Sequence, residues 1–192
     1  MKKIILSAAI LLMAVISANA QFNLGIKGGV NYSTIHSDNL RNSSVAGYQA
    51  GLFARVGGGI YLQPEVYLSS SGGSFTSNDN TYSGKVTFTN LNVPVLVGLR
   101  FGPKNLNFRL MAGPEYISKL SQNDNLSTNF NNAYSNFGNS YKSNMLGYQA
   151  GAGVDLGAAT IDLRYQGNFD NYNSAYNQHQ NLWALSIGFK IF

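Results

Sequence analysis

The feature that most constrains this chain is a two-residue period of hydrophobicity that recurs in eight separate segments. In each segment apolar side chains alternate with polar ones, which is typical of β-strands with one face in an apolar environment. We find no strong 3.6-residue stripe after residue 20, so an all-β fold is predicted. The predicted strands are Phe22–Tyr32, Ala46–Val56, Ile60–Leu68, Asn90–Phe101, Leu106–Tyr116, Leu146–Leu156, Ile161–Phe169 and Trp183–Ile191.

The charged residues inside these strands all fall on the polar face. A soluble sandwich would bury the apolar face and expose the charged one. A membrane barrel turns the apolar face to lipid, where one Arg or Lys near the midplane costs about 2–4 kcal/mol, and the charged face into its lumen. The predicted lumen charges are Lys27, Arg55, Glu65, Arg100, Arg109, Glu115, Asp155, Asp162, Arg164 and Lys190.

The connections between the predicted strands alternate between short and long. The short ones are centred on Gly57–Gly59, Gly102–Asn105 and Gly157–Ala158, and the long ones run over Thr34–Ser43, Ser69–Gly84, Ser118–Lys142 and Asp170–Gln180. Outer-membrane barrels have tight periplasmic turns and long extracellular loops. We therefore predict an eight-stranded antiparallel up-and-down transmembrane β-barrel with that orientation. A soluble barrel of the lipocalin type is the structural alternative and needs an apolar interior.

The first twenty residues predict a secretory signal peptide. A basic start at Lys2 and Lys3 precedes an apolar run, and Ala18 and Ala20 form a small-x-small cleavage pattern. The mature domain is then 21–192, in the cell outer membrane with lipid as its surroundings. The chain contains no cysteine, and its modest positive charge without a basic cluster gives no reason to expect nucleic acid as a partner.

Eight strands leave an interior that side chains about fill. We expect Glu65, Arg100, Arg109, Asp162 and Arg164 to form a buried ion-pair lattice. A charge-selective pore is the alternative. The sequence Gly-Tyr-Gln-Ala-Gly occurs at 47–51 and again at 147–151. If this is a true repeat, rather than convergent strand composition, Arg55 and Asp155 occupy equivalent positions and carry opposite charge.

The chain has two histidines, His36 and His179, and both fall in predicted long loops. The first and last of these loops are neighbours in a closed barrel, so Asp38 and the two histidines could meet as a rim site. No nucleophile with recognisable spacing accompanies them, and no convincing third metal ligand is present. We therefore predict no enzyme activity, no metal site and no cofactor.

The longest predicted loop is rich in asparagine and aromatic residues. Rigid aromatic rings among adaptable amides suit recognition of an extracellular protein or glycan. A loop that only keeps the barrel top soluble is the alternative. The recognition candidates are Phe130, Tyr134, Phe137 and Tyr141.

Four short motifs, taken together and in order, resemble those of the PorT-like outer-membrane β-barrel family. They are Leu-Gln-Pro-Glu at 62–65, Asn-Val-Pro-Val-Leu at 92–96, Gly-Pro-Glu-Tyr at 113–116 and Gly-Phe-Lys at 188–190. The resemblance implies a barrel of about eight strands without catalysis. Apart from the resemblance, we predict a monomer with a structural or surface-interaction role carried by the long loops. The alternative is a narrow channel or a barrel associated with secretion or transport, a helper role that the family name suggests. One departure is that Phe192 is out of phase with Phe189 and Ile191, which a bulge or an added residue would explain.

Overall fold

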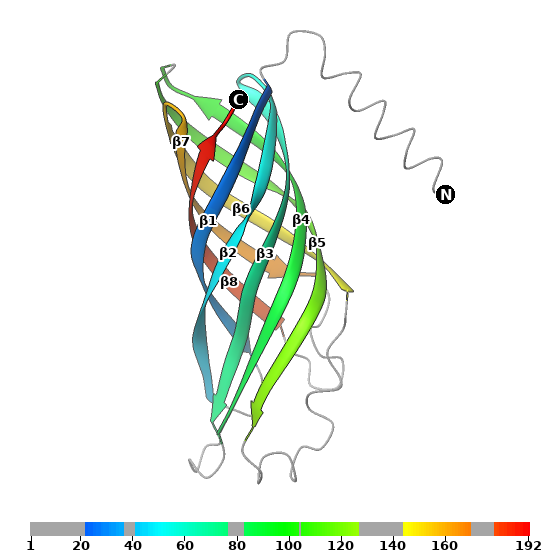
Figure 1. Ribbon diagram of the computed structural model, residues 1–192. Helices are drawn as coiled ribbons and strands as arrows, with labels where there is room; N and C mark the ends of the chain where they lie inside the picture. Colours follow the sequence, from blue (N-terminus) through cyan, green and yellow to red (C-terminus); the bar gives the residue numbers. More distant parts are fainter. Residues whose placement is uncertain (1–21, 37–40, 77–82, 104, 127–143, 170–178) are drawn as a thin grey trace, which may run out of the picture.

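The computed structural model describes residues 22–36, 41–76, 83–103, 105–126, 144–169 and 179–192. Eight antiparallel strands pair in sequence order, and β8 pairs back onto β1 to close a barrel (Figure 1). The predicted fold is confirmed. The strands are β1 (Phe22–His36), β2 (Arg41–Gly57), β3 (Ile60–Thr76), β4 (Ser83–Phe101), β5 (Leu106–Leu126), β6 (Asn144–Leu156), β7 (Ala159–Asn168) and β8 (His179–Lys190).

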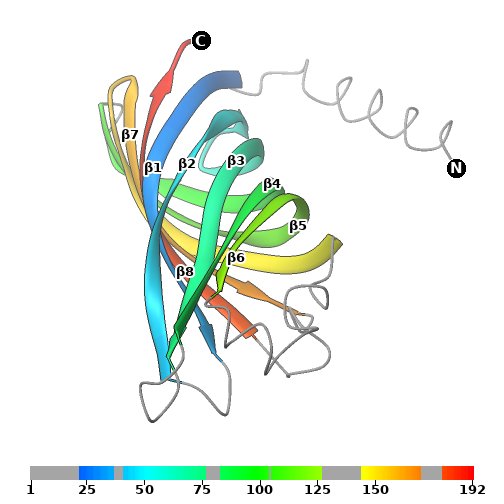
Figure 2. The same cartoon turned by 60° about the horizontal axis from the view of Figure 1, so that its bottom comes forward.

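The apolar face of the sheet points outward and the charged face points into the barrel, as the alternation predicts. Apolar side chains such as Ile60, Leu163 and Ile187 are 69%, 52% and 64% exposed on the outside. Charged side chains such as Arg55 and Arg109 are only 1% exposed on the inside. A soluble barrel of the lipocalin type would show the opposite arrangement. Figures 1 and 2 show the strands coiling steeply around the enclosed interior.

Tight turns occupy one end of the barrel. Gly57, Gly102 and Gly157 have φ angles of 123°, 127° and 60°, in the region that side-chain-bearing residues rarely adopt. These glycines therefore let three hairpins reverse direction within a few residues. The end of β8 lies at the same end of the barrel (Figure 1).

At the opposite end the strands run further than predicted. β3 continues to Thr76 and β4 begins at Ser83, while β5 continues to Leu126. The predicted long loops Ser69–Gly84 and Ser118–Lys142 were therefore too long, as were Thr34–Ser43 and Asp170–Gln180. The apolar alternation stops where lipid contact would stop, but a backbone hydrogen-bond ladder needs no apolar side chains.

The end of the chain contains a β-bulge. The backbone N–H groups of Ile191 and Phe192 both donate to the carbonyl of Leu24, at 2.7 and 3.3 Å, and the Leu24 N–H donates to the Phe192 carbonyl at 3.2 Å. Two residues therefore oppose one, which is the definition of a bulge. Both side chains are exposed on the outside, at 53% and 77%. The bulge explains why Phe192 is out of phase with Phe189 in the sequence.

The described residues contain no helix that is long and apolar enough to cross a bilayer. The predicted signal peptide, 1–20, lies outside the described residues, so the cleavage site and the mature boundaries 21–192 stay predictions.

Candidate functional site: a charge network across the lumen

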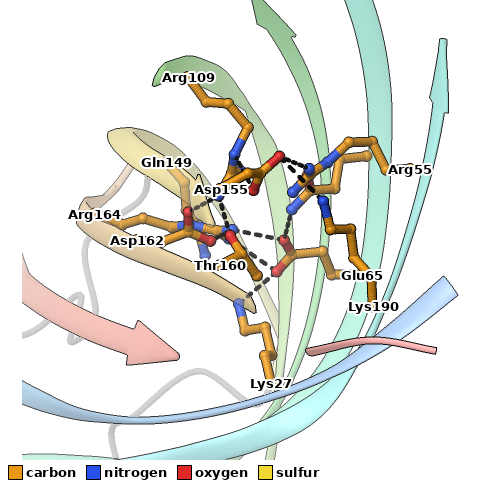
Figure 3. Close-up of polar contacts among 11 residues, drawn as sticks. Lys27, Arg55, Glu65, Arg109, Gln149, Asp155, Thr160, Asp162, Arg164 and Lys190 are labelled. Atoms are coloured by element: carbon orange, nitrogen blue, oxygen red, sulfur yellow. Dashed lines mark hydrogen bonds and ion pairs between the residues drawn. The ribbon is translucent and has the colours of Figure 1, made fainter. Parts of the chain in front are cut away.

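A continuous series of ion pairs crosses the barrel interior in the half nearer the tight turns. The network contains three carboxylates, and each of them contacts at least two cationic side chains (Figure 3). They belong to Glu65 on β3, Asp155 on β6 and Asp162 on β7. The cations come from β1, β2, β5, β7 and β8, so the network ties together strands on all sides of the lumen. Its members are Lys27, Arg55, Glu65, Arg109, Asp155, Asp162, Arg164 and Lys190.

Glu65 and Asp162 share Arg164. The Lys27 ammonium lies 2.5 Å from Glu65, and Arg164 lies 2.8 Å from the same carboxylate. The guanidinium of Arg164 also reaches Asp162 at 2.7 Å, and Arg109 approaches the other oxygen of Asp162 at 2.5 Å. Each of these two carboxylates therefore contacts two cations, which offsets much of the cost of removing the carboxylates from water.

Asp155 connects the network to the opposite wall. Its carboxylate lies 2.8 Å from Arg109 Nε and 2.7 Å from Arg55 Nη1, and the Lys190 ammonium is 3.6 Å away. Arg55 and Asp155 hold equivalent positions in the two Gly-Tyr-Gln-Ala-Gly strands, and the structure brings them into direct contact across the lumen.

Neutral groups also donate to and accept from these charges. Gln63 accepts a hydrogen bond from Arg55 Nε at 2.7 Å and donates one to Glu65 at 2.6 Å. Arg109 also donates to the Thr160 hydroxyl. The sequence analysis did not select Gln63 or Thr160, although both occupy inward positions of the same alternation that located the charges.

Aromatic rings fill space beside the cations. The guanidinium of Arg55 lies 5.1 Å from the centre of the Tyr61 ring, and the Lys27 ammonium lies 4.1 Å from the Tyr67 ring centre. Both distances allow favourable cation–π interaction. Tyr61 and Tyr67 are themselves almost fully buried, so they occupy lumen volume as well as partnering charge.

Glu115 belongs to a cluster that Arg164 joins to the network, by donating to the Gln149 side-chain oxygen at 3.4 Å. The Tyr67 hydroxyl and the Gln149 amide each donate to Glu115 Oε1 at 2.7 Å. Gln149 also donates to the Tyr67 hydroxyl, so the three groups form a closed triangle. The Glu115 carboxylate is 1% exposed and takes its hydrogen bonds from these neutral donors.

The last two predicted lumen charges lie at the tight-turn mouth. Arg100 is half-buried and sits opposite Arg109 in the pairing of β4 with β5. Lys190, at the end of β8, is half-buried and reaches inward to Asp155. The structure therefore places eight of the ten predicted charges in the closed interior and these two at its rim.

Space inside the lumen is limited at this level. A recess next to the network is lined by Lys27, Tyr67, Gln149 and Arg164, among others, and is too narrow to admit a water-sized sphere. Phe53, Leu96 and Met111 are also buried on the inner face, at 4% exposure or less. The arrangement is thus a packed polar core that can hold the wall together, rather than a row of groups around an open cavity.

The inner surface towards the long connections is lined by serine and asparagine. Asn90 donates to the Ser71 hydroxyl at 2.9 Å, and Asn92 donates to the Ser69 hydroxyl at 2.7 Å. The Ser33 hydroxyl donates to the Gly72 carbonyl at 2.6 Å. These hydrogen-bonded side chains are uncharged, and they lie among buried apolar residues such as Phe88 and Ile117. The ammonium of half-buried Lys119 lies 5.8 Å from the centre of the Phe88 ring.

The predicted recognition residues lie outside the described residues: Phe130, Tyr134, Phe137 and Tyr141. Asp38 is also outside them. The two histidines are described, and their predicted placement in loops was wrong: His36 is the last residue of β1 and His179 is the first residue of β8. The prediction failed because the polar ends of these strands do not alternate in hydropathy.

A closed barrel of eight strands, apolar outside and charged inside, defines an outer-membrane β-barrel protein. The chain belongs to the outer membrane protein beta-barrel domain family, whose model matches residues 17–189. The protein is therefore an integral outer-membrane protein. A search of curated proteins found no significant match.

Solved structures of outer-membrane barrels share the fold. The outer membrane protein OprG from Pseudomonas aeruginosa is 13% identical, with 92% of this chain and 99% of that chain covered and a TM-score of 0.54. The outer membrane enzyme PagL is 12% identical, with 85% and 99% covered and a TM-score of 0.51. At these identities the likeness shows the fold alone.

Proposed function

We propose that this protein is a non-conducting outer-membrane barrel whose role, structural or in surface interaction, is carried by its long connections on the extracellular side. The observation behind the proposal is the cross-lumen network, above all the direct contact of Arg55 with Asp155 between opposite strands. Because each carboxylate of the network contacts at least two cations and side chains fill the space between them, we assign the interior a structural role in holding the barrel wall together. Recognition of a partner is then left to the long connections.

A narrow channel, or a barrel associated with secretion, is the alternative that the PorT-like resemblance supports. Conductance of the purified protein in planar lipid bilayers separates the two. We expect no unitary conductance steps across a range of voltages and salt concentrations. Reproducible steps that change in size when Glu65 is replaced by glutamine would overturn the proposal, because they would show that ions pass this carboxylate.

The surface-interaction role assigns recognition to four aromatic residues in the predicted loop, Phe130, Tyr134, Phe137 and Tyr141. Cells that display the protein would be applied to arrays of purified glycans and extracellular proteins. We expect at least tenfold weaker retention when all four residues are replaced by serine, with heat-modifiable gel mobility unchanged. Equal retention by the two forms, or no retention by either, would leave only the structural role.

We also propose that the chain is a monomer without catalytic activity. The fold shared with PagL gives no catalytic residues to this chain, since the likeness is one of fold. Incubation with outer-membrane lipids and peptides should give no cleavage products above those of the His36→Asn, His179→Asn double variant. Sedimentation in detergent should give the mass of one chain.

A further inference from the structure

The charges of the cross-lumen network do not cancel. Five cationic side chains share three carboxylates, so the positive charges exceed the negative ones by two. Including the other two predicted lumen charges, Arg100 and Glu115, leaves this difference unchanged, because one is basic and the other acidic. A surplus of buried positive charge is costly unless an anion balances it.

One part of the network is balanced within itself. Lys27 lies 2.5 Å from Glu65, and Arg164 lies 2.8 Å from Glu65 and 2.7 Å from Asp162. These two carboxylates and two cations together carry no net charge. The surplus therefore belongs to the rest of the network.

The surplus gathers around Asp155. Three cations, Arg55, Arg109 and Lys190, contact this single carboxylate. Arg100 is placed close to the same group, because it is the direct partner of Arg109 in the pairing of β4 with β5. This part of the lumen therefore has a positive electrostatic potential, which attracts anions.

The residues of this group lie at the tight-turn mouth. Arg55 and Asp155 are each two residues from a turn glycine at positive φ, Gly57 and Gly157. Lys190 is the last residue of β8 and is half-buried, and its ammonium reaches inward toward Asp155 (Figure 3). An anion that approaches from the tight-turn side of the membrane therefore meets these cations first.

Two of these cations have hydrogen-bonding capacity left over. Arg55 donates from Nε to Gln63 and from Nη1 to Asp155, each at 2.7 Å, while its buried Nη2 has no hydrogen-bond partner among the described residues. Lys190 is 3.6 Å from Asp155, which is longer than an ordinary N–H···O hydrogen bond. A buried N–H group without an acceptor is rare and costs free energy. Both groups thus point to a further acceptor that carries negative charge.

We propose that the tight-turn mouth of the lumen binds a phosphate group between Arg55 and Lys190. Arginine presents its N–H donors in a planar fork that suits phosphate oxygens, and lysine contributes a compact positive charge. Asp155 fixes Arg55 through Nη1 and leaves Nη2 for the phosphate. The phosphate offsets the surplus charge and adds a contact between β2 and β8.

Two sources can supply this phosphate group. One is a free inorganic phosphate ion, and the other is the headgroup of an anionic phospholipid in the membrane leaflet next to the tight turns. The chemistry that recognises the group is the same in both cases, so each source is tested separately.

The test uses the full-length mature protein in a maltoside detergent, which contains no phosphate, at constant ionic strength. Inorganic phosphate and dihexanoyl phosphatidylglycerol are titrated in separate experiments, and phosphorus NMR measures binding. We expect saturable binding of one phosphate group per chain. Binding of the inorganic ion identifies a free phosphate site, and binding of phosphatidylglycerol alone identifies a headgroup site.

Two variants probe the site, and a third is the control. Lys190→Met should weaken binding at least tenfold. Arg55→Lys keeps the positive charge but removes the planar donors, and it should also weaken binding at least tenfold. Lys119→Met removes the same charge from a half-buried lysine further along β5, away from the tight turns, and should leave the affinity within twofold.

Three results would overturn the proposal. The first is that neither probe binds to barrels whose heat-modifiable mobility shows them to be folded. The second is that Lys190→Met and Arg55→Lys bind as tightly as the unmodified protein. The third is that Lys119→Met weakens binding as much as Lys190→Met, because phosphate would then respond to the total charge of the barrel and not to a site at its mouth.

Discussion

Arg109 is the residue on which the charge network most depends. Its guanidinium contacts Asp155 from β6 and Asp162 from β7, and its side chain is completely buried. The planar guanidinium can satisfy two carboxylates at once, which an ammonium cannot do with the same geometry. Removing it leaves both carboxylates with fewer partners in a closed interior.

We predict that Arg109→Met lowers the free energy of unfolding by about 3–5 kcal/mol, the usual cost of breaking a buried ion pair from one side. Urea unfolding in lipid vesicles, followed by tryptophan fluorescence, measures it. Arg100→Met is the matched control, because Arg100 is half-buried at the mouth, and it should cost less. Equal urea resistance of Arg109→Met and the unmodified protein would contradict a structural role for the network.

The missing side chain of Gly153 leaves space for the ion pair between Arg109 and Asp162. A Cβ added there would lie 2.1 Å from Asp162 Oδ1 and 2.7 Å from Arg109 Nη2, so both side chains would have to move. We predict that Gly153→Ala destabilises the barrel by about 1–3 kcal/mol through overpacking. Gly28→Ala is the control, because an added Cβ there meets nothing nearer than the Gln49 carbonyl at 3.8 Å. Thermal unfolding should separate the two variants; similar midpoints would mean that the network tolerates displacement.

At the scale of the single strand, β7 illustrates how depth in the membrane determines whether a lipid-facing position can carry a charged residue. Leu163 is 52% exposed near the centre of β7, and Phe169 is 66% exposed just beyond its end. Arginine on the lipid face costs about 2–4 kcal/mol at the bilayer midplane and about 0–1 kcal/mol near the interfaces. We predict that Leu163→Arg blocks assembly, whereas Phe169→Arg assembles normally. Heat-modifiable gel mobility reads out assembly, and normal mobility of Leu163→Arg would show that Leu163 does not face lipid.

The sequence predicted the strands well where lipid imposes a pattern and poorly where it does not. Outward-facing apolar residues such as Leu163, Leu185 and Ile187 alternate with inward-facing residues, because one face of the sheet meets lipid and the other meets the polar lumen. The eight strands and their inward charges could therefore be located from the sequence. The extensions to Thr76 and Leu126 continue the backbone pairing but carry no such pattern. The identity of each ion-pair partner was also beyond prediction, because it depends on how closely opposite walls approach.

At the scale of the whole molecule, the two ends of the barrel differ in construction. One end has tight turns with glycines at positive φ and the ion-pair network inside the lumen. The other end has long connections and inward serine and asparagine side chains that hydrogen-bond to one another. The charged interior is built from residues of seven strands, so no hairpin contains a complete network. We expect assembly to be cooperative, because the complete network, which includes Lys27 of β1 and Lys190 of β8, can form only once β1 and β8 have met.

The orientation of these two ends in the outer membrane can be tested with single cysteines, because the chain contains none. Gly58 lies in a tight turn with open space around it, and Ser121 is exposed near the far end of β5. We predict that a membrane-impermeant maleimide labels Ser121→Cys on intact cells, whereas Gly58→Cys reacts only after the outer membrane is opened. Tight turns face the periplasm in outer-membrane barrels. The reverse labelling pattern would place the long connections inside the cell envelope, where they could not contact extracellular ligands.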